Sequence, residues 1–137
     1  MGELRAFGFA EPGEFRDHLT ALALSGSKMA TAGLWKHDYE PDGEDIEAVG
    51  ELQAVLDSNG EPCATVEITR VESHPFAQVP WEFAAAEGEG FVDIDHWRTG
   101  HREYYRELGV EIDDDDHVVC VWFRIVQHGD RVTPNAG

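Results

Sequence analysis

The apolar and polar residues in the first third of the chain follow first a helical and then a strand-like pattern. Over residues 12–25 the apolar side chains recur at helical spacing and Gly26 follows as a C-terminal cap, which predicts a helix. The stretch KMATAGLW, residues 28–35, predicts a strand, although alanine and glycine are weak strand formers. Residues 36–50 are rich in Pro, Gly and acidic side chains, so we expect an acidic loop and a candidate flap there.

Two later regions alternate with the period of a strand. In residues 50–73, two alternating segments flank Ser58, Asn59 and Gly60, and this arrangement predicts a β-hairpin with a tight turn. The segment HVVCVWFRIVQ, residues 117–127, is mostly apolar and predicts a buried strand. The run EIDDDD before it predicts a solvated acidic loop, because it lacks the ligand spacing of a calcium loop.

Two helices are predicted between the hairpin and the last strand. The first starts near Pro80, a residue favoured at the beginning of helices, and ends before Gly88. The second is amphipathic, with Asp93 or Asp95 as its N-cap and Leu108 near its end. The order helix, strand, hairpin, two helices and long strand predicts an α+β fold, with a curled sheet or small β-barrel flanked by helices.

The composition indicates a soluble protein and argues against broad binding of nucleic acid. A chain of 137 residues predicts a single domain over residues 1–137, and it has no apolar run long enough for a membrane helix. The N-terminal sequence lacks a signal-peptide pattern, so we expect a cytoplasmic protein. The net charge of −18 would repel a polyanion, so any contact with RNA must be local.

We expect neither a metal site nor a cofactor. Cys63 and Cys120 lie in strand-like apolar contexts, which suit small buried side chains better than a disulfide. The sequence has no CxxC or HExxH pattern, and its seven histidines are scattered along the chain.

Lys28 is the first candidate for chemistry, because it is the one charged residue in the apolar stretch ALALSGSKMATAGLW. A neutral amine at this position could act as a base toward the hydroxyl of Thr31. Positions three apart face opposite sides of a regular strand, so this pairing requires a bend, which Gly26 or Gly33 could provide. Periodicity alone favours the alternative, a lysine that neutralises the last carbonyls of the preceding helix.

A second candidate is Glu87 in the segment AAAEGEG. A glutamate at the C-terminal end of a helix opposes the helix dipole, and such a misfit is expected where a side chain serves a site. Glu89 is its rival, but Glu87 continues the helix and should have the better fixed side chain. An exposed glutamate before a glycine-rich turn remains the simpler interpretation.

The third candidate is the helix with the sequence DHWRTGHREYYREL. Arg98, Arg102 and Arg106 recur every four residues and form a cationic stripe beside an aromatic one. Such a surface could stack a base and hold a phosphate. The alternative is structural, with the aromatic rings in the core and the arginines paired with surface acids.

Taken together, these segments resemble the ASCH-domain family, a PUA-like group associated with RNA. The GxKxxT pattern of that family is present as Gly26, Lys28 and Thr31 in GSKMAT. Further matches are FGF near the N-terminus, VESHPFAQV, EFAAAEGEG, the pattern WRxxHxxYY, and the final strand VVCVWFRIV. The resemblance covers nearly the whole chain, and it implies a small PUA-like β-barrel with flanking helices and a cleft that contains the GxKxxT residues.

The resemblance also implies a chemistry. One branch, the bacterial acetylcytidine amidohydrolases, is similar in using a Lys, a Thr and a Glu, which fall on Lys28, Thr31 and Glu87. In that scheme Thr31 is the nucleophile, Lys28 its activating base and Glu87 the group that orients or charges the lysine. The implied partner is a modified nucleoside. The candidate substrate-binding residues are Trp35, Arg98, His101 and Tyr105.

Two alternatives stay open, because other members resemble ribonucleases or RNA binders without catalysis. A metal-independent ribonuclease or RNA-binding protein would hold a short single-stranded RNA in the same cleft, and a third possibility is a ligand sensor without turnover. The chain also departs from the family pattern. Met29 stands where many members have threonine, Gly50 is followed by Glu51 where aspartate is common, and residues 37–48 form an additional acidic loop.

Overall fold

Three α-helices and five β-strands make up the part of the chain that the computed structural model describes, residues 4–129. The helices are α1 (Glu14–Leu24), α2 (Trp81–Ala86) and α3 (Ile94–Glu107). The strands are β1 (Arg5–Phe7), β2 (Ala30–Leu34), β3 (Leu52–Leu56), β4 (Pro62–Pro75) and β5 (His117–His128). Short helical turns occupy Trp35–Tyr39, which is a π-helix, Glu40–Asp42 and Phe76–Gln78.

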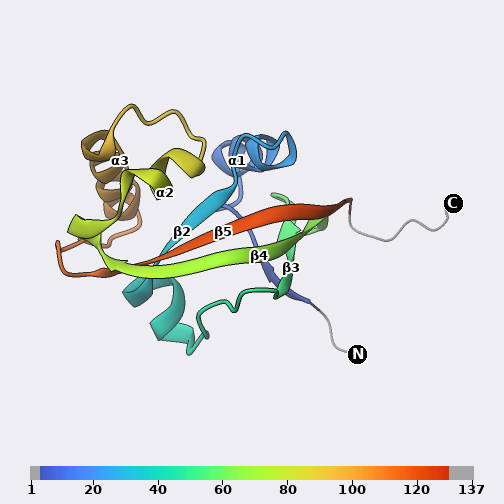
Figure 1. Ribbon diagram of the computed structural model, residues 1–137, viewed down its shortest axis with the longest axis horizontal. Coiled ribbons are helices and arrows are strands. Elements are labelled where there is room, and N and C mark those ends of the chain that lie inside the picture. The colour runs from blue at the N-terminus through green and yellow to red at the C-terminus, as the bar shows by residue number, and fades with distance from the viewer. Residues whose placement is uncertain (1–3, 130–137) are drawn as a thin grey trace, which may run out of the picture.

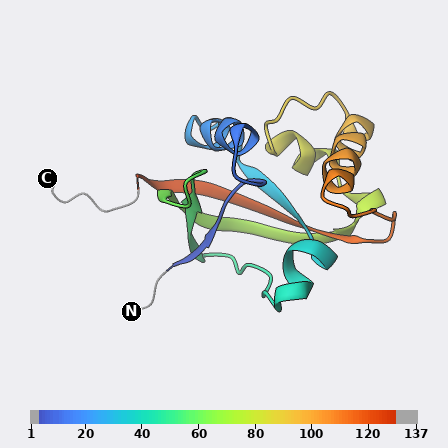
Figure 2. The same ribbon diagram turned by 180° about the vertical axis from the view of Figure 1, so that it is seen from behind.

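The strands form one curled sheet in the order β1-β3-β4-β5-β2. Strand β1 runs parallel to β3, and the other three pairs are antiparallel. Register shifts at Thr65/Val66 and Ile68/Arg70 interrupt the long β4–β5 ladder, and such bulges bend and twist a sheet. The result is a half-barrel with helices, an α+β fold as predicted, whose edge strands are β1 and β2 (Figures 1 and 2).

The residues of β5 alternate between two cores, as the period of a strand requires. Val119 and Val121 pack in the core that includes α1, whereas Val118 and Cys120 pack in the core that includes α2 and α3. All three α-helices lie along one side of the long strands in Figures 1 and 2. Side chains from opposite faces of β5 therefore pack in the core that includes α1 and in the core that includes α2 and α3.

The predicted elements are confirmed within a few residues at their ends. The hairpin predicted over 50–73 is the antiparallel pair β3–β4, and the predicted helices are α1, α2 and α3. Asp93 is the N-cap of α3, since its Oδ1 accepts the His96 backbone N–H at 2.8 Å. The chain after α1 turns at Gly26, which has a φ of 90°. Strand β1 has no counterpart in the predicted elements.

The prediction of a loop from residue 36 is wrong for residues 36–42, which are helical. The π-helix is held by Asp38, whose Oδ2 accepts the Leu34 backbone N–H at 2.8 Å, and by Tyr39, which is buried in the core. The following segment is fastened to β1, because Arg5 forms an ion pair with Glu44 at 3.1 Å. Composition indicated a loop, but local hydrogen bonds and burial decide the structure.

The described residues also bear on the predictions about membranes, metals and cysteines. No helix within residues 4–129 is long and apolar enough to cross a bilayer. The same part of the chain contains no group of three His, Cys, Asp or Glu side chains arranged to hold a metal ion. Both cysteines are free thiols in strands, Cys63 half-buried and Cys120 buried.

Candidate functional site

A cavity of about 460 Å³ lies between the two edge strands of the half-barrel. Its walls include Arg5–Phe7 of β1 and Thr31–Gly33 of β2, together with residues of α1 and α3. Lys28, Thr31 and Glu87 all line it, and so do His101 and Tyr105. Five of the seven sequence-predicted site residues are thus brought together by segments far apart in the chain.

Lys28 lies on the turn between α1 and β2, where the chain is not yet a strand. Its backbone N–H bonds to the Leu22 carbonyl at 3.0 Å, and β2 begins only at Ala30. Lys28 thus lies before the regular strand that contains Thr31, and both residues line the cavity. The lysine side chain is 1% exposed, and its Nζ donates to the Ala30 carbonyl at 2.8 Å.

Two carboxylates reach this lysine from the end of α2. Glu89 Oε2 lies 2.5 Å from Lys28 Nζ, and Glu87 Oε2 lies 3.6 Å from it. Glu87 is the C-cap of α2, and Gly88 then turns the chain with a φ of 66°. This turn directs Glu89, which sequence reasoning ranked second, to the shorter contact with Lys28.

The Glu87–Glu89 segment packs against the backbone just before β2. The Met29 N–H donates to the Ala86 carbonyl at 2.8 Å, and a Cβ added at Gly88 would lie 1.9 Å from the Ser27 oxygen. A side chain at Gly88 has no space there. The close approach of the two backbones therefore positions both glutamates beside Lys28.

Glu87 is 2% exposed and has three polar neighbours. Its Oε1 accepts the Trp97 indole N–H at 2.5 Å and lies 3.5 Å from His101 Nε2, while its Oε2 faces Lys28. Burial raises the pKa of Glu87 above its ordinary value, and the charges of Lys28 and His101 only partly oppose this effect. Burial thus makes the Glu87 carboxyl easier to protonate than a glutamate in water.

Helix α3 supplies the aromatic wall of the cavity. His101 stacks on Trp97 with ring centroids 4.0 Å apart, and its Nδ1 donates to the Trp97 carbonyl at 2.9 Å. The Tyr105 hydroxyl donates to Asp38 Oδ2 at 2.7 Å. Burial, and then the charge of Asp38, raise the pKa of Tyr105 well above its ordinary value, so Tyr105 stays neutral.

The cavity wall is acidic. Its lysine and arginine side chains are Arg5, Arg16 and Lys28. Its carboxylates are more numerous, namely Glu11, Asp38, Asp42, Glu44, Glu47, Glu87 and Glu89. Such a wall disfavours a ligand with several negative charges and provides many acceptors for hydroxyl and amino groups.

Both arginines of the cavity wall are already engaged. Arg5 pairs with Glu44 and donates to the Asp45 carbonyl at 2.7 Å. Arg16 donates to the Ala10 carbonyl at 2.7 Å and holds the connection between β1 and α1. Lys28 and Arg5 are paired with carboxylates, so a phosphate would have to compete with these carboxylates for either cation.

Two predicted substrate-binding residues do not line the cavity. Trp35 stacks on Tyr39 with ring centroids 5.8 Å apart and packs against the core. Arg98 donates to the Ala77 carbonyl at 2.8 Å. Their contact with a substrate remains a prediction.

The rest of the arginine stripe is directed toward the acidic loop before β5. Arg102 pairs with Asp114 at 2.6 Å, and Arg106 pairs with Glu111 at 3.2 Å. Neither arginine lines the cavity. The stripe matches the structural alternative, in which arginines pair with surface acids.

Sequence reasoning missed several residues of the cavity wall. Gln53 on β3 is 1% exposed and donates to Glu51 at 3.1 Å, and its signal was a polar residue inside an alternating strand. Asp38, which accepts a hydrogen bond from Tyr105, lies in the segment that the sequence predicted as an acidic loop and candidate flap. Phe9, whose ring lies 5.3 Å from Lys28 Nζ, belongs to a segment without a clear period.

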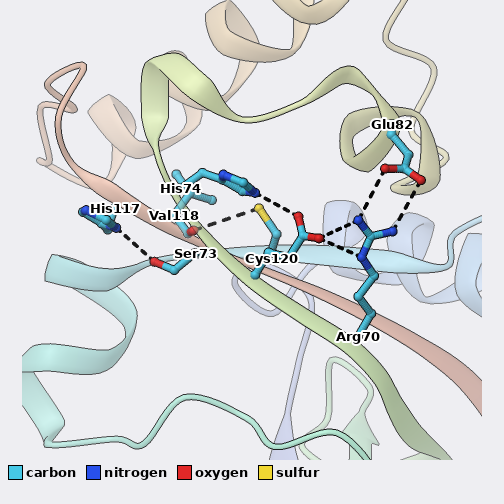
Figure 3. Close-up of polar contacts among 8 residues, drawn as sticks. Arg70, Ser73, His74, Glu82, His117, Val118 and Cys120 are labelled. Carbon is cyan, nitrogen blue, oxygen red and sulfur yellow. Dashed lines mark hydrogen bonds and ion pairs between the residues drawn. The ribbon is translucent and has the colours of Figure 1, made fainter.

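A second polar cluster lies outside the cavity, on β4, β5 and α2 (Figure 3). Arg70 pairs with Glu72 and with Glu82 at 3.4 Å, and its guanidinium lies 4.3 Å from the Trp122 ring. The bonds of Glu72 to His74 and to Arg70 lower the pKa of this glutamate. These mutually satisfied contacts fasten α2 to the sheet.

Comparison with known proteins places the chain in a family. The model of the ASCH domain matches residues 5–127. A crystal structure of an ASCH domain from Lactobacillus crispatus JV V101 is similar with 32% identity and a TM-score of 0.75, covering 92% of this chain and 81% of that one. Protein EF3133 from Enterococcus faecalis V583, of family DUF984, has 26% identity and a TM-score of 0.81, covering 93% and 79%.

A more distant structure shares the fold alone. The ZmASCH protein from Zymomonas mobilis, solved as a mutant, has 9% identity and a TM-score of 0.53, covering 88% of this chain and 67% of that one. No protein of curated function matches the sequence significantly. On the family match over nearly its whole length, the chain belongs to the ASCH-domain family.

Proposed function

We propose that this protein is a small hydrolase that removes the acyl group from an N-acylated, cytidine-type nucleoside. The observation that carries the proposal is the meeting of Lys28, Thr31, Glu87 and Glu89 at one cavity. A volume of about 460 Å³ lies in the range of pockets for small molecules. The cytidine part rests on the resemblance of Lys28, Thr31 and a glutamate to the acetylcytidine amidohydrolase branch.

The residues suggest a two-step acyl transfer. The Thr31 hydroxyl oxygen attacks the acyl carbonyl carbon. The hydroxyl proton passes to Lys28, while Lys28 transfers one of its own protons to Glu89. The carbon–nitrogen bond then breaks, and the nucleoside amine leaves with the proton that Thr31 released to Lys28. Water attacks the threonyl ester, releases the carboxylic acid and restores the hydroxyl of Thr31.

Glu89 suits the role of proton acceptor better than Glu87. It is the nearer of the two to Lys28 Nζ, at 2.5 Å against 3.6 Å, and its side chain is 13% exposed, against 2% for Glu87. A proton acceptor must reach the group from which the proton comes. Glu87, which the sequence favoured, retains the role of a buried partner that helps to orient the lysine.

The charge of the cavity supports a nucleoside rather than a nucleotide or RNA. Carboxylates outnumber lysine and arginine in the wall, and both arginines are held by other groups. A phosphodiester would be repelled by a wall in which carboxylates predominate, whereas an uncharged nucleoside would not. The alternative of an RNA-binding protein or ribonuclease is therefore the less favoured of the two.

The test is incubation of the purified protein with acetylcytidine, with cytidine followed by chromatography. Thr31→Val and Glu89→Gln should each lower kcat/KM by about a hundredfold or more. Lys36→Met is the matched control, because Lys36 pairs with Asp116 and does not line the cavity. Turnover that survives in the Thr31→Val variant would contradict the proposed nucleophile. Absent turnover together with salt-sensitive RNA binding would favour the alternative.

A further inference from the structure

The charges around Lys28 do not balance without an additional proton. Lys28, Glu87 and Glu89 are 1%, 2% and 13% exposed in their side chains, and together they place two carboxylates against one ammonium. An uncompensated charge with so little access to water is costly, and such clusters take up a proton instead. The proton needs a group close to these carboxylates.

His101 is the group that lies in position for it. Its Nδ1 faces the Trp97 carbonyl at 2.9 Å, and because a carbonyl only accepts, Nδ1 carries a hydrogen. The other ring nitrogen, Nε2, is 3.5 Å from Glu87 Oε1. The ring itself is held by stacking on Trp97 and by contact with Phe91, whose centroid lies 5.6 Å away.

We propose that Glu87 and His101 hold one proton between them, and that His101 is a positioning residue which keeps the buried charges around Lys28 at a net zero. The proton exchanges between the two side chains, so that neutral His101 with protonated Glu87 and imidazolium with carboxylate are both populated, and both sum to zero. Lys28 and Glu89 then form a balanced ion pair of their own. The catalytic part of this inference rests on the proposed function, whereas the shared proton does not.

The other titratable groups near the pair do not disturb this balance. Lys28 and Glu89 compensate each other. From β5, the thiol of Cys120 has its pKa raised by burial and then by the charge of Glu87, so it stays neutral. Tyr105, one turn along α3, stays neutral as well. The excess proton of the site therefore belongs to Glu87 and His101.

The shared proton can be observed directly by nitrogen NMR of the protein labelled with ¹⁵N-histidine, at neutral pH and without substrate. The His101 signals are assigned by their loss in His101→Gln. In the native protein we expect a protonated Nδ1, and an Nε2 shift between those of protonated and unprotonated nitrogens. In Glu87→Gln the Nε2 shift should become that of a nitrogen without a proton, while Glu89→Gln should leave it as in the native protein.

Two results would overturn the inference. One is a native spectrum in which Nε2 of His101 is fully unprotonated or in which Nδ1 lacks its hydrogen. This result is read from the native protein, so it counts even if the Glu87→Gln variant fails to fold. The other is an identical His101 spectrum in the native protein and in Glu87→Gln. Neither result depends on turnover, so a failure of the proposed function leaves this test intact.

Kinetics with acetylcytidine test the catalytic consequence. His101→Gln should lower kcat by about tenfold or more and move the pH at which kcat declines, with KM changed by less than about threefold. A raised KM with an unchanged pH profile would instead show that His101 contacts the substrate, and would contradict the positioning role.

Discussion

The indole of Trp97 donates its Nε1–H to Glu87 Oε1 at 2.5 Å, and both side chains are buried. The pair joins α3 to the end of α2 underneath the cavity. It also ties a core residue to the site, because the same glutamate faces Lys28. This hydrogen bond therefore contributes to the stability of the fold and also fixes a carboxylate that faces Lys28.

Removing the indole N–H donor of Trp97 should lower the free energy of unfolding by more than the loss of ring atoms alone would. Trp97→Phe leaves the Glu87 carboxyl with one donor fewer in a buried place, which costs about 1–3 kcal/mol in the free energy of unfolding. Urea unfolding measures the change. The matched control is Trp81→Phe, at a tryptophan that is 41% exposed, and equal losses in the two variants would contradict the prediction.

The raised pKa of Glu87 makes stability depend on pH. Between its ordinary value of 4.5 and its raised value in the fold, Glu87 holds a proton that the unfolded chain has released, so stability falls as pH rises through this window. Glu87→Gln removes the dependence. Its melting temperature should exceed that of the native protein above the window and approach it near about pH 4.

Thermal melts at several pH values check this, with Glu103→Gln on the exposed face of α3 as the control. A difference between Glu87→Gln and the native protein that does not change with pH would rule out a shifted Glu87.

Gly88 should tolerate no side chain. Gly88→Ala places a Cβ 1.9 Å from the Ser27 oxygen at a φ of 66°, so the two backbones must separate. Gly90→Ala is the matched control, with a φ of 92° and no atom within 4 Å of the added Cβ, and it should cost about 1–2 kcal/mol. We expect a clearly larger loss for Gly88→Ala in denaturant unfolding, and similar losses would contradict the packing described.

Lys28 should matter for stability as well as for chemistry. Lys28→Met leaves the Glu89 carboxylate without its cation, and breaking a buried pair in this way costs about 3–5 kcal/mol. Adding Glu89→Gln to this variant should restore part of the loss, because one unpaired charge is removed. Denaturant unfolding of the single and double variants measures the coupling, and purely additive effects would contradict it.

Hydrophobic periodicity predicts the helices and long strands of this protein because each has enough residues to show a period. Strand β1 spans only three residues, Arg5–Phe7, and its place is set by pairing with β3 rather than by its own pattern. The π-helix after β2 depends on Asp38 bonding to the Leu34 N–H, a contact that composition does not reveal. Local patterns thus miss two of the segments that line the cavity.

The site was only partly accessible from the sequence. Periodicity alone favoured a passive Lys28, and resemblance to the ASCH family grouped it with Thr31 and Glu87. The preference for Glu87 over Glu89 rested on helix continuity, but the turn at Gly88 gives Glu89 the shorter contact to Lys28. A backbone turn of this kind is set by the packing of distant segments.

The open side of the half-barrel has a mechanical consequence. Each edge strand is hydrogen-bonded to a single neighbour, β1 to β3 and β2 to β5, and the cavity touches both edges. A bound ligand would contact both edge strands, β1 and β2, and so link them across the cavity. Occupancy should therefore slow amide hydrogen exchange in β1 and β2 while leaving β4, already bonded on both sides, nearly unchanged.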